Sequence, residues 1–312
     1  MLARVQQLIS LLLLLANGAA VAICIGRAMP AAFMVVFPLV IVAGYAGVLA
    51  IEFSLLWRSY RWNDRDRPTV VRLLRAWAAE ATGAPRVFLW RQPFRSRTEP
   101  DYLPESARGR RGVLLVHGFF CNRGLWNPWM RRLRDADVPF IAINLEPIFG
   151  SIEGYREVID RAVRDLERAT SLAPVIVAHS MGGLAIRFWL GAGQQCERIH
   201  RIVTIASPHA GTRIANRGFG ANIRQMRPTS AWLLALNAQT SPSQHERFVC
   251  FWSHCDNIVV PTRSATLPGA LNRHLDATPH VQMVYHPAVI DEVLRAVRSA
   301  GESCKPTGTA AP

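Results

Sequence analysis

The chain has 312 residues, of which 50% are hydrophobic and 19% are charged, and this composition excludes a disordered polymer and a small disulfide-rich scaffold. The formal net charge of +14 is compatible with attraction to a polyanion or to an anionic membrane surface. Nearly all of that positive charge is arginine, because Lys305 is the only lysine, and codon bias explains this skew more simply than function does. We therefore discount the charge and expect no nucleic-acid partner.

The first 57 residues contain only three charged side chains, which are Arg4, Arg27 and Glu52. Two apolar stretches, residues 8–25 and 31–57, each reach the ~20 residues that a membrane-spanning helix needs. A short turn that ends at Pro30 joins them, which favours a helical hairpin with both ends on one side of the membrane. A signal peptide cleaved near residues 20–22 is the alternative for the first stretch.

A basic juxtamembrane segment, residues 58–84, follows the second stretch. Its arginines predict a multi-pass inner-membrane protein whose large domain faces the cytoplasm, since positive residues collect on that side. Pro68 can start a helix with an apolar face formed by Val71, Leu74, Trp77 and Ala78. That face either lies on the membrane surface or packs against the globular domain.

The six cysteines are scattered and show neither paired metal-ligand spacing nor a compact disulfide framework. They are Cys24, Cys121, Cys196, Cys250, Cys255 and Cys304. We expect free buried thiols and no metal site, with one disulfide as the alternative.

Beyond residue 85, short apolar runs alternate with longer amphipathic stretches, which is typical of a mostly parallel sheet covered by helices. The predicted strands are Val87–Trp90, Val113–Val116, Phe140–Asn144, Val175–Val177, Ile202–Ile205 and Phe248–Trp252. The clearest helix is Ser151–Thr170, and residues 301–312 read as a flexible tail.

The segment around Ser180 has the pattern of a nucleophile elbow, which is a sharp turn between a strand and a helix. The residues two before and two after the nucleophile must be small, and Ala178 and Gly182 are. The N–H group of Met181 then lies at a helix N-terminus, where it can stabilise an oxyanion. Phe119, after a second Gly-containing turn, is the expected second donor, and His117 beside it is expected to be structural.

These motifs give the chain a resemblance to the α/β-hydrolases, and within them to bacterial triacylglycerol lipases and esterases, over residues 85–300. The segment Ala206–Thr212 is also similar to the Ser/Thr-Pro-His-x-Gly-Thr segment of those lipases. The resemblance implies a catalytic triad in the order Ser, Asp, His and no redox cofactor. It places the acid after a late strand, which selects Asp256 over Asp276, because Asp276 lies only four residues before His280.

The resemblance places the base in a loop before the closing helix, for which residues 287–297 are the candidate. His286 falls at the N-cap of that helix, where the dipole disfavours an imidazolium, and His274 fits a short edge strand at 272–276. We therefore predict His280 as the base. In the same fold, residues 211–243 would form a small cap or lid that receives acyl chains, with closure of the domain core as the alternative.

The sequence thus predicts a membrane-anchored serine hydrolase that cleaves carboxylic esters, above all of lipids, through an acyl-enzyme. The expected site is Ser180, Asp256 and His280 with the oxyanion donors Phe119 and Met181, and its partners are a lipid or small ester and membrane lipids. A thioesterase or acyltransferase on the same triad, or an inactive membrane-bound scaffold, are the alternatives. The oligomeric state stays open.

Overall fold

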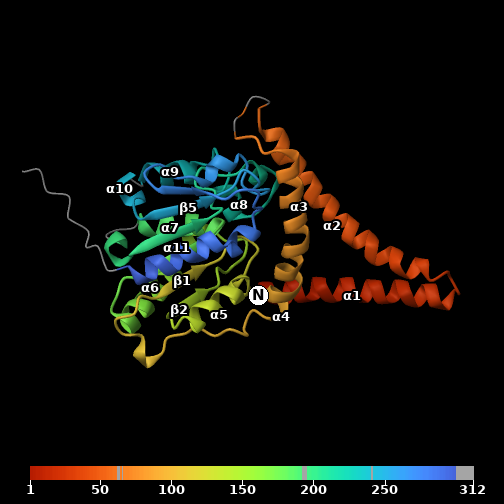
Figure 1. Cartoon of the computed structure of the whole chain (residues 1–312), viewed down its shortest axis with the longest axis horizontal. Helices are drawn as coiled ribbons and strands as arrows, with labels where there is room; N and C mark the ends of the chain where they lie inside the picture. Colours follow the sequence, from red (N-terminus) through yellow and green to blue (C-terminus); the bar gives the residue numbers. More distant parts are fainter. Residues whose placement is uncertain (62–63, 65, 192–194, 240–241, 300–312) are drawn as a thin grey trace, which may run out of the picture.

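The computed structural model describes residues 1–61, 64, 66–191, 195–239 and 242–299, and its centre is a six-stranded sheet (Figure 1). The strands are β1 (Val113–Val116), β2 (Phe140–Ile143), β3 (Val175–His179), β4 (Arg201–Ile205), β5 (Phe248–Trp252) and β6 (Leu271–His274). They lie in the order β2-β1-β3-β4-β5-β6, and each neighbouring pair is parallel. The predicted parallel sheet is confirmed. The strand predicted at Val175–Val177 is two residues shorter than β3, which continues to His179.

Alternate side chains of each strand enter two separate layers of the core, because successive residues of a strand point to opposite faces. Leu114 and Ile176 pack in the layer that contains α6 (Arg156–Thr170) and α7 (Met181–Leu190). Leu115 and Val177 pack in the opposite layer, which contains α5 (Asn127–Asp135) and α11 (Pro287–Arg298). The sheet is therefore buried on both faces, as its apolar strands require.

The predicted strand at Val87–Trp90 is wrong. The helix α3 (Val70–Pro85) continues there into the π-helical segment η1 (Arg86–Arg91) and the short helix α4 (Gln92–Phe94). The branched and aromatic composition resembled a strand, but only Val87 is fully buried, whereas Trp90 is exposed. The segment packs one face on the core, so its position beside the domain decides its conformation over its local propensity.

The two apolar N-terminal stretches form the long helices α1 (Leu2–Gly26) and α2 (Ala32–Ser59), which project together from the domain (Figure 1). Both are long and apolar enough to cross a membrane. The start of α1 is docked on the domain, where Gln6 Nε2 donates to Gln92 Oε1 at 2.9 Å. The last turns of α2 are docked as well, through the buried Leu49, Phe53 and Leu56. The second predicted apolar stretch is thus partly a packing element of the domain.

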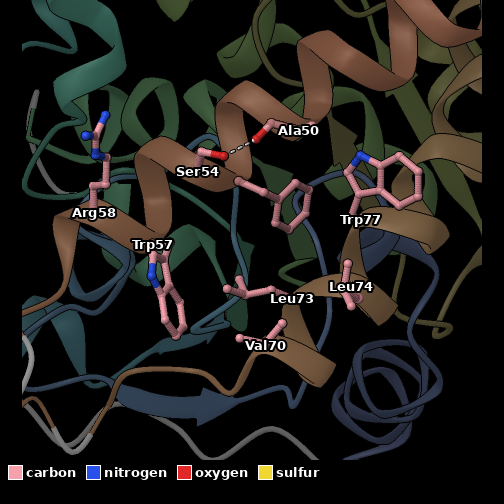
Figure 2. Close-up of a pocket in the computed structure, with 9 residues that line it drawn as sticks. Ala50, Ser54, Trp57, Arg58, Val70, Leu73, Leu74 and Trp77 are labelled. Carbon is pink, nitrogen blue, oxygen red and sulfur yellow. Dashed lines mark hydrogen bonds between the residues drawn. The ribbon is translucent and has the colours of Figure 1, made fainter.

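The helix α3 runs beside α2 and begins after Thr69, whose Oγ1 accepts from the N–H of Arg72 at 3.3 Å. Its buried face is formed by Leu73, Ala76 and Glu80, whereas Val71 and Leu74 are exposed, so of the two alternatives for that face these two residues do not pack on the domain. The exposed apolar face leaves an open groove of about 690 Å³ between α2 and α3 (Figure 2). It is lined by Ala50, Phe53, Ser54, Trp57, Arg58, Val70, Leu73, Leu74 and Trp77.

The segment predicted as a cap or lid consists of short helices, not strands. They are η6 (Arg213–Arg217), α8 (Ala221–Gln225), α9 (Ala231–Gln239) and α10 (Pro242–His245). Leu233 and Leu236 are buried in the core, whereas Ile223 and Met226 also face the cavity described below. Part of the segment therefore packs in the core and part lines the cavity, and residues 240–241 lie outside the described part.

Six shorter 3-10 helices complete the described elements. They are η2 (Glu105–Ala107), η3 (Arg123–Trp126), η4 (Ile152–Tyr155), η5 (Gln195–Arg198), η7 (Thr262–Ala265) and η8 (Gln282–Tyr285). The predicted helix at 151–170 is thus η4 followed by α6. Cys24, Cys121, Cys250 and Cys255 are free and buried, while Cys304 and the tail 301–312 lie outside the described residues.

Candidate active site

Ser180 occupies the turn between β3 and α7 with a backbone φ of 54° and ψ of −128°. A positive φ is uncommon for a residue other than glycine, and such strained positions cluster at functional sites. The N–H of Ser180 donates to the carbonyl of Ile205 in β4 at 2.8 Å, which fixes the turn to the neighbouring strand. This is the local geometry expected of a nucleophile elbow.

The glycines around this turn are required by close backbone contacts. A Cβ at Gly182 would lie 2.6 Å from the carbonyl oxygen of His117, and a Cβ at Gly118 would lie 2.7 Å from the Cβ of Ser180. Both distances are shorter than real Cβ contacts allow. The two predicted turns are therefore packed directly against each other.

Asp256 and His280, which the sequence proposed as acid and base, are hydrogen-bonded in the structure. His280 Nδ1 lies 3.0 Å from Asp256 Oδ1 and 3.1 Å from Oδ2, and both side chains are buried. Asp256 follows β5, and its Oδ1 also accepts from the N–H groups of Ile258 and Val259 at 2.9 Å. The carboxylate of Asp256 thus faces the ring of His280 and two backbone N–H groups.

The electrostatics of His280 favour proton uptake. Burial by itself would lower its pKa, but the charge and hydrogen bond of Asp256 outweigh burial and leave the pKa above the usual 6.5. The carboxylates of Glu80 and Glu52 act in the same direction. By contrast, burial lowers the pKa of His117 to about 4, and its ring bridges the carbonyl of Gly118 and the N–H of Leu145. His117 therefore has the structural place predicted for it.

The competing residues lie in other surroundings. His286 is the N-cap of α11, where its Nδ1 accepts from the N–H of Ala288 at 3.2 Å. His274 is exposed at the end of the edge strand β6. Asp276 is half exposed and pairs with Arg72 of α3 at 3.1 Å. These three side chains are thus placed away from the contact between Asp256 and His280.

The two predicted oxyanion donors flank Ser180. Met181 is the first residue of α7, where backbone N–H groups have no acceptor within the helix and the helix dipole favours negative charge. Phe119 follows β1 in the turn that packs on Ser180, and it borders the same cavity.

Ser180 and His280 share a cavity of about 480 Å³ with mostly apolar walls. Phe119, Ile223 and Met226 form part of these walls. The long helices contribute as well: α2 supplies Tyr45, Leu49 and Glu52, and α3 supplies Glu80 and Ala84. Part of the cavity wall therefore comes from the N-terminal hairpin, which the sequence treated as an anchor only.

The segment Ser207–Thr212 is hydrogen-bonded to the loop that follows Asp256. Thr212 Oγ1 donates to the carbonyl of Ile258 at 2.6 Å and accepts from the N–H of Val260 at 3.1 Å. The buried His209 is held near Thr204 Oγ1 at 3.1 Å, while Arg187 donates to its carbonyl. Burial keeps the pKa of His209 well below its usual value, so it serves as a neutral structural residue.

Sequence reasoning missed three polar residues at this site, namely Glu52, Glu80 and Asn257. Glu52 had a signal, because an ionisable residue in an otherwise apolar span is a functional candidate by default. Glu80 had no such signal in the sequence, because the residues of its helix do not indicate which face is buried. Among the described residues, no group of His, Cys, Asp and Glu side chains could hold a metal ion.

Comparisons with known proteins place this geometry in context. The profile of the alpha/beta hydrolase family matches residues 113–296. A solved lipase of Bacillus licheniformis, BlEst2 in its mature form, is 14% identical with a TM-score of 0.54, over 64% of this chain and 95% of that one. Lipase B of Aspergillus fumigatus is 17% identical with a TM-score of 0.55, over 67% of this chain and 58% of that one. A search of curated proteins found no match.

Proposed function

The chain belongs to the α/β-hydrolase family, and from this premise we propose that it is a serine hydrolase that cleaves carboxylic esters of lipids. The observation that carries the proposal is the strained Ser180, which borders the same apolar cavity as the His280 that is paired with Asp256. The resemblance of the fold to solved lipases agrees with this class of reaction.

In the proposed reaction, Ser180 Oγ attacks the ester carbonyl carbon while His280 Nε2 accepts the hydroxyl proton. The N–H groups of Phe119 and Met181 stabilise the oxyanion. The tetrahedral intermediate then expels the alcohol, which receives the proton from His280, and an acyl-enzyme remains. Water, activated by His280, attacks the acyl-enzyme and releases the carboxylic acid. Asp256 stays ionised throughout and holds the proton of His280 on Nδ1.

The lipid part of the proposal rests on the cavity and its walls. The space of about 480 Å³ is large enough for an acyl chain, and its walls are mostly apolar. One wall is the helix α2, which continues into the exposed apolar part of the hairpin. An acyl chain can thus be held between the hydrolase domain and α2.

The hairpin is proposed to anchor the protein in the inner membrane. Residues 11–26 of α1 are mostly exposed and rise about 24 Å along the helix axis, against about 30 Å for a bilayer core. The domain would therefore lie directly on the membrane, with the exposed Val70, Val71 and Leu74 of α3 toward the lipids. The groove between α2 and α3 opens on this same face (Figure 2).

The proposed organisation is a hairpin at 1–57, a basic linker and helix at 58–84 and a hydrolase domain at 85–300 that carries a cap at 211–243. The hydrolase domain is proposed to face the cytoplasm. In this arrangement the cap contributes Ile223 and Met226 to the cavity wall, and α2 contributes Tyr45, Leu49 and Glu52.

The proposal is tested by labelling with a fluorophosphonate probe and by a hydrolysis panel on the full-length protein. The panel includes short nitrophenyl esters, triglycerides, phospholipids and acyl-CoA, with Ser180→Ala as the blank. We expect labelling of the wild-type protein, hydrolysis of lipid esters, and loss of both in Ser180→Ala with an unchanged melting temperature. Hydrolysis of acyl-CoA alone would indicate a thioesterase, and an unlabelled wild-type protein would indicate a scaffold.

A further inference from the structure

Two carboxylates outside the triad, the half-buried Glu52 and the buried Glu80, reach the loop of His280 from the N-terminal helices. Glu52 lies on α2 and Glu80 lies on α3, where it is only 2% exposed. Both border the cavity that contains Ser180. Carboxylates withdrawn from water are rare without a partner, and each of these two has a hydrogen-bond donor in the loop that carries His280 or next to it.

Glu80 holds the residue directly after the base. Its Oε1 accepts a hydrogen bond from the N–H of Val281 at 3.0 Å. Val281 is itself buried, so an unpaired N–H at this position would cost free energy. Without the acceptor, the loop would have to move to satisfy a buried donor.

Glu52 holds the base itself through one intervening side chain. The Nδ2 group of Asn257 donates to Glu52 Oε2 at 2.7 Å, and Asn257 Oδ1 accepts from the backbone N–H of His280 at 3.2 Å. Because Glu52 accepts from the amide nitrogen of Asn257, the amide oxygen of Asn257 is turned toward the N–H of His280. The carboxylate on α2 thereby fixes which way this amide faces.

We propose that Glu52 and Glu80 are positioning residues that hold the backbone N–H groups of His280 and Val281, and so fix the imidazole between Asp256 and Ser180. This inference rests on the proposed role of His280 as the base. It makes α2 and α3 part of the active site, because the loop of the base is tied to the hairpin as well as to the hydrolase domain. A small displacement of a catalytic group lowers the rate strongly, which gives these contacts their effect.

The role proposed for Glu80 is that of a hydrogen-bond acceptor, not of a charge. Burial raises the pKa of Glu80 to about 7, so a neutral side chain is present in much of the protein near neutral pH. Glutamine has the same length and an acceptor oxygen, whereas aspartate keeps the charge but is one methylene shorter. The two replacements therefore separate reach from charge.

The test uses full-length protein in detergent micelles with the variants Glu80→Gln, Glu80→Asp, Glu52→Gln and Glu52→Asp. The substrate is a short nitrophenyl ester, so that binding of its small acyl group does not depend on the parts of the cavity that are distant from Ser180. The measurements are kcat, KM, the rate of fluorophosphonate labelling and the melting temperature. Glu157→Asp, at an 81% exposed side chain on α6, is the matched control.

We expect the two glutamine variants and the control to keep kcat and the labelling rate within about threefold of the wild-type protein. The two aspartate variants should lose about tenfold or more in both, with little change in KM, because the base is displaced while binding is kept. Asn257→Leu, which removes the acceptor for His280, should lower kcat as Glu52→Asp does. It also replaces that variant in the test if Glu52→Asp does not fold.

Wild-type rates in the aspartate variants and in Asn257→Leu would overturn the inference. Losses in the glutamine variants that equal or exceed those in the aspartate variants would overturn it as well, since an acceptor of the right reach would then not be enough. Failure of the proposed function has a different signature, because the wild-type protein itself would then show no labelling.

Discussion

The three C-terminal histidines differ in what their rings contact, and this decides which of them can act as a base. Only His280 among them is paired with a buried carboxylate, through contacts of 3.0 and 3.1 Å to Asp256. His286 instead uses Nδ1 to cap α11, and His274 is exposed on the edge strand. The same residue type thus has a carboxylate-paired, a capping and a surface position within thirteen residues of chain.

We predict that His280→Ala lowers kcat by several orders of magnitude, as Ser180→Ala does, because a serine without its base is a poor nucleophile. His274→Ala and His286→Ala should keep most of their activity. The measurement is kcat on a nitrophenyl ester, with the melting temperature as a check on folding. Substantial activity in His280→Ala, with loss in either of the others, would reassign the base.

A pH dependence follows from the environment of His280. It accepts a proton from Ser180 only when it is neutral. Burial by itself would lower its pKa, but Asp256, Glu80 and Glu52 together outweigh burial and raise the pKa above the usual 6.5. The rate of fluorophosphonate labelling should therefore fall as the pH decreases through a midpoint above 6.5. A midpoint clearly below 6.5 would contradict the proposed charge environment.

At the scale of elements, the start of α7 shows how a helix N-terminus fits against a neighbouring turn. A Cβ at Gly182 would lie 2.6 Å from the backbone oxygen of His117 and 2.9 Å from that of Val116. Backbone atoms of a buried strand end cannot move aside easily. At Gly191, at the other end of the same helix, the nearest atoms are at an ordinary 3.7 Å.

Gly182→Val is accordingly predicted to unfold the protein or to lower its melting temperature by many degrees, since it overpacks the core against backbone. Gly191→Ala should change the melting temperature by only a few degrees. Thermal unfolding followed by circular dichroism compares the two. A stable, active Gly182→Val protein would show that the turn is not packed as described.

The helix α2 is a second element whose role extends beyond its composition, because its Leu49 borders the cavity. Leu49→Trp would fill part of that space from the hairpin side. We predict a decrease of about tenfold or more in kcat/KM for long-chain esters, because the larger side chain would deprive the acyl chain of its apolar contacts. The kcat/KM for a nitrophenyl acetate should change little. Equal effects on both substrates would place the acyl chain elsewhere. Val48→Trp, at an exposed position on the same helix, is the control.

For the whole molecule, we predict the orientation in a membrane from charge, since the inter-helix turn carries Arg27 alone while several arginines follow α2. We predict that alkaline phosphatase fused to the C-terminus is inactive, because the enzyme matures only outside the cytoplasm. A fusion that ends after Ala28, in the turn, should be active. Strong activity of an intact C-terminal fusion would reverse the orientation and make a disulfide plausible again.

The residues that carry local geometry could be predicted from the sequence alone. The elbow around Ser180 requires a strand, small neighbours and a helix within a few residues, so its signature is contiguous. The strands of the sheet are equally local, because burial on both faces demands continuous apolar runs. Asp256 and His280 came from the resemblance, which supplies the chain order that local patterns lack.

The tertiary structure decided what depends on packing between distant segments. The strand pattern at 87–90 became η1 because the segment follows α3 along the domain, and α3 buries Leu73, Ala76 and Glu80 because α2 and the loop of His280 lie on that side. The spacing of apolar residues along a helix does not indicate which of its faces packs against which neighbouring segment. The contacts of Glu52 with Asn257 and of Glu80 with Val281 join residues about 200 positions apart, and only the folded chain brings them together.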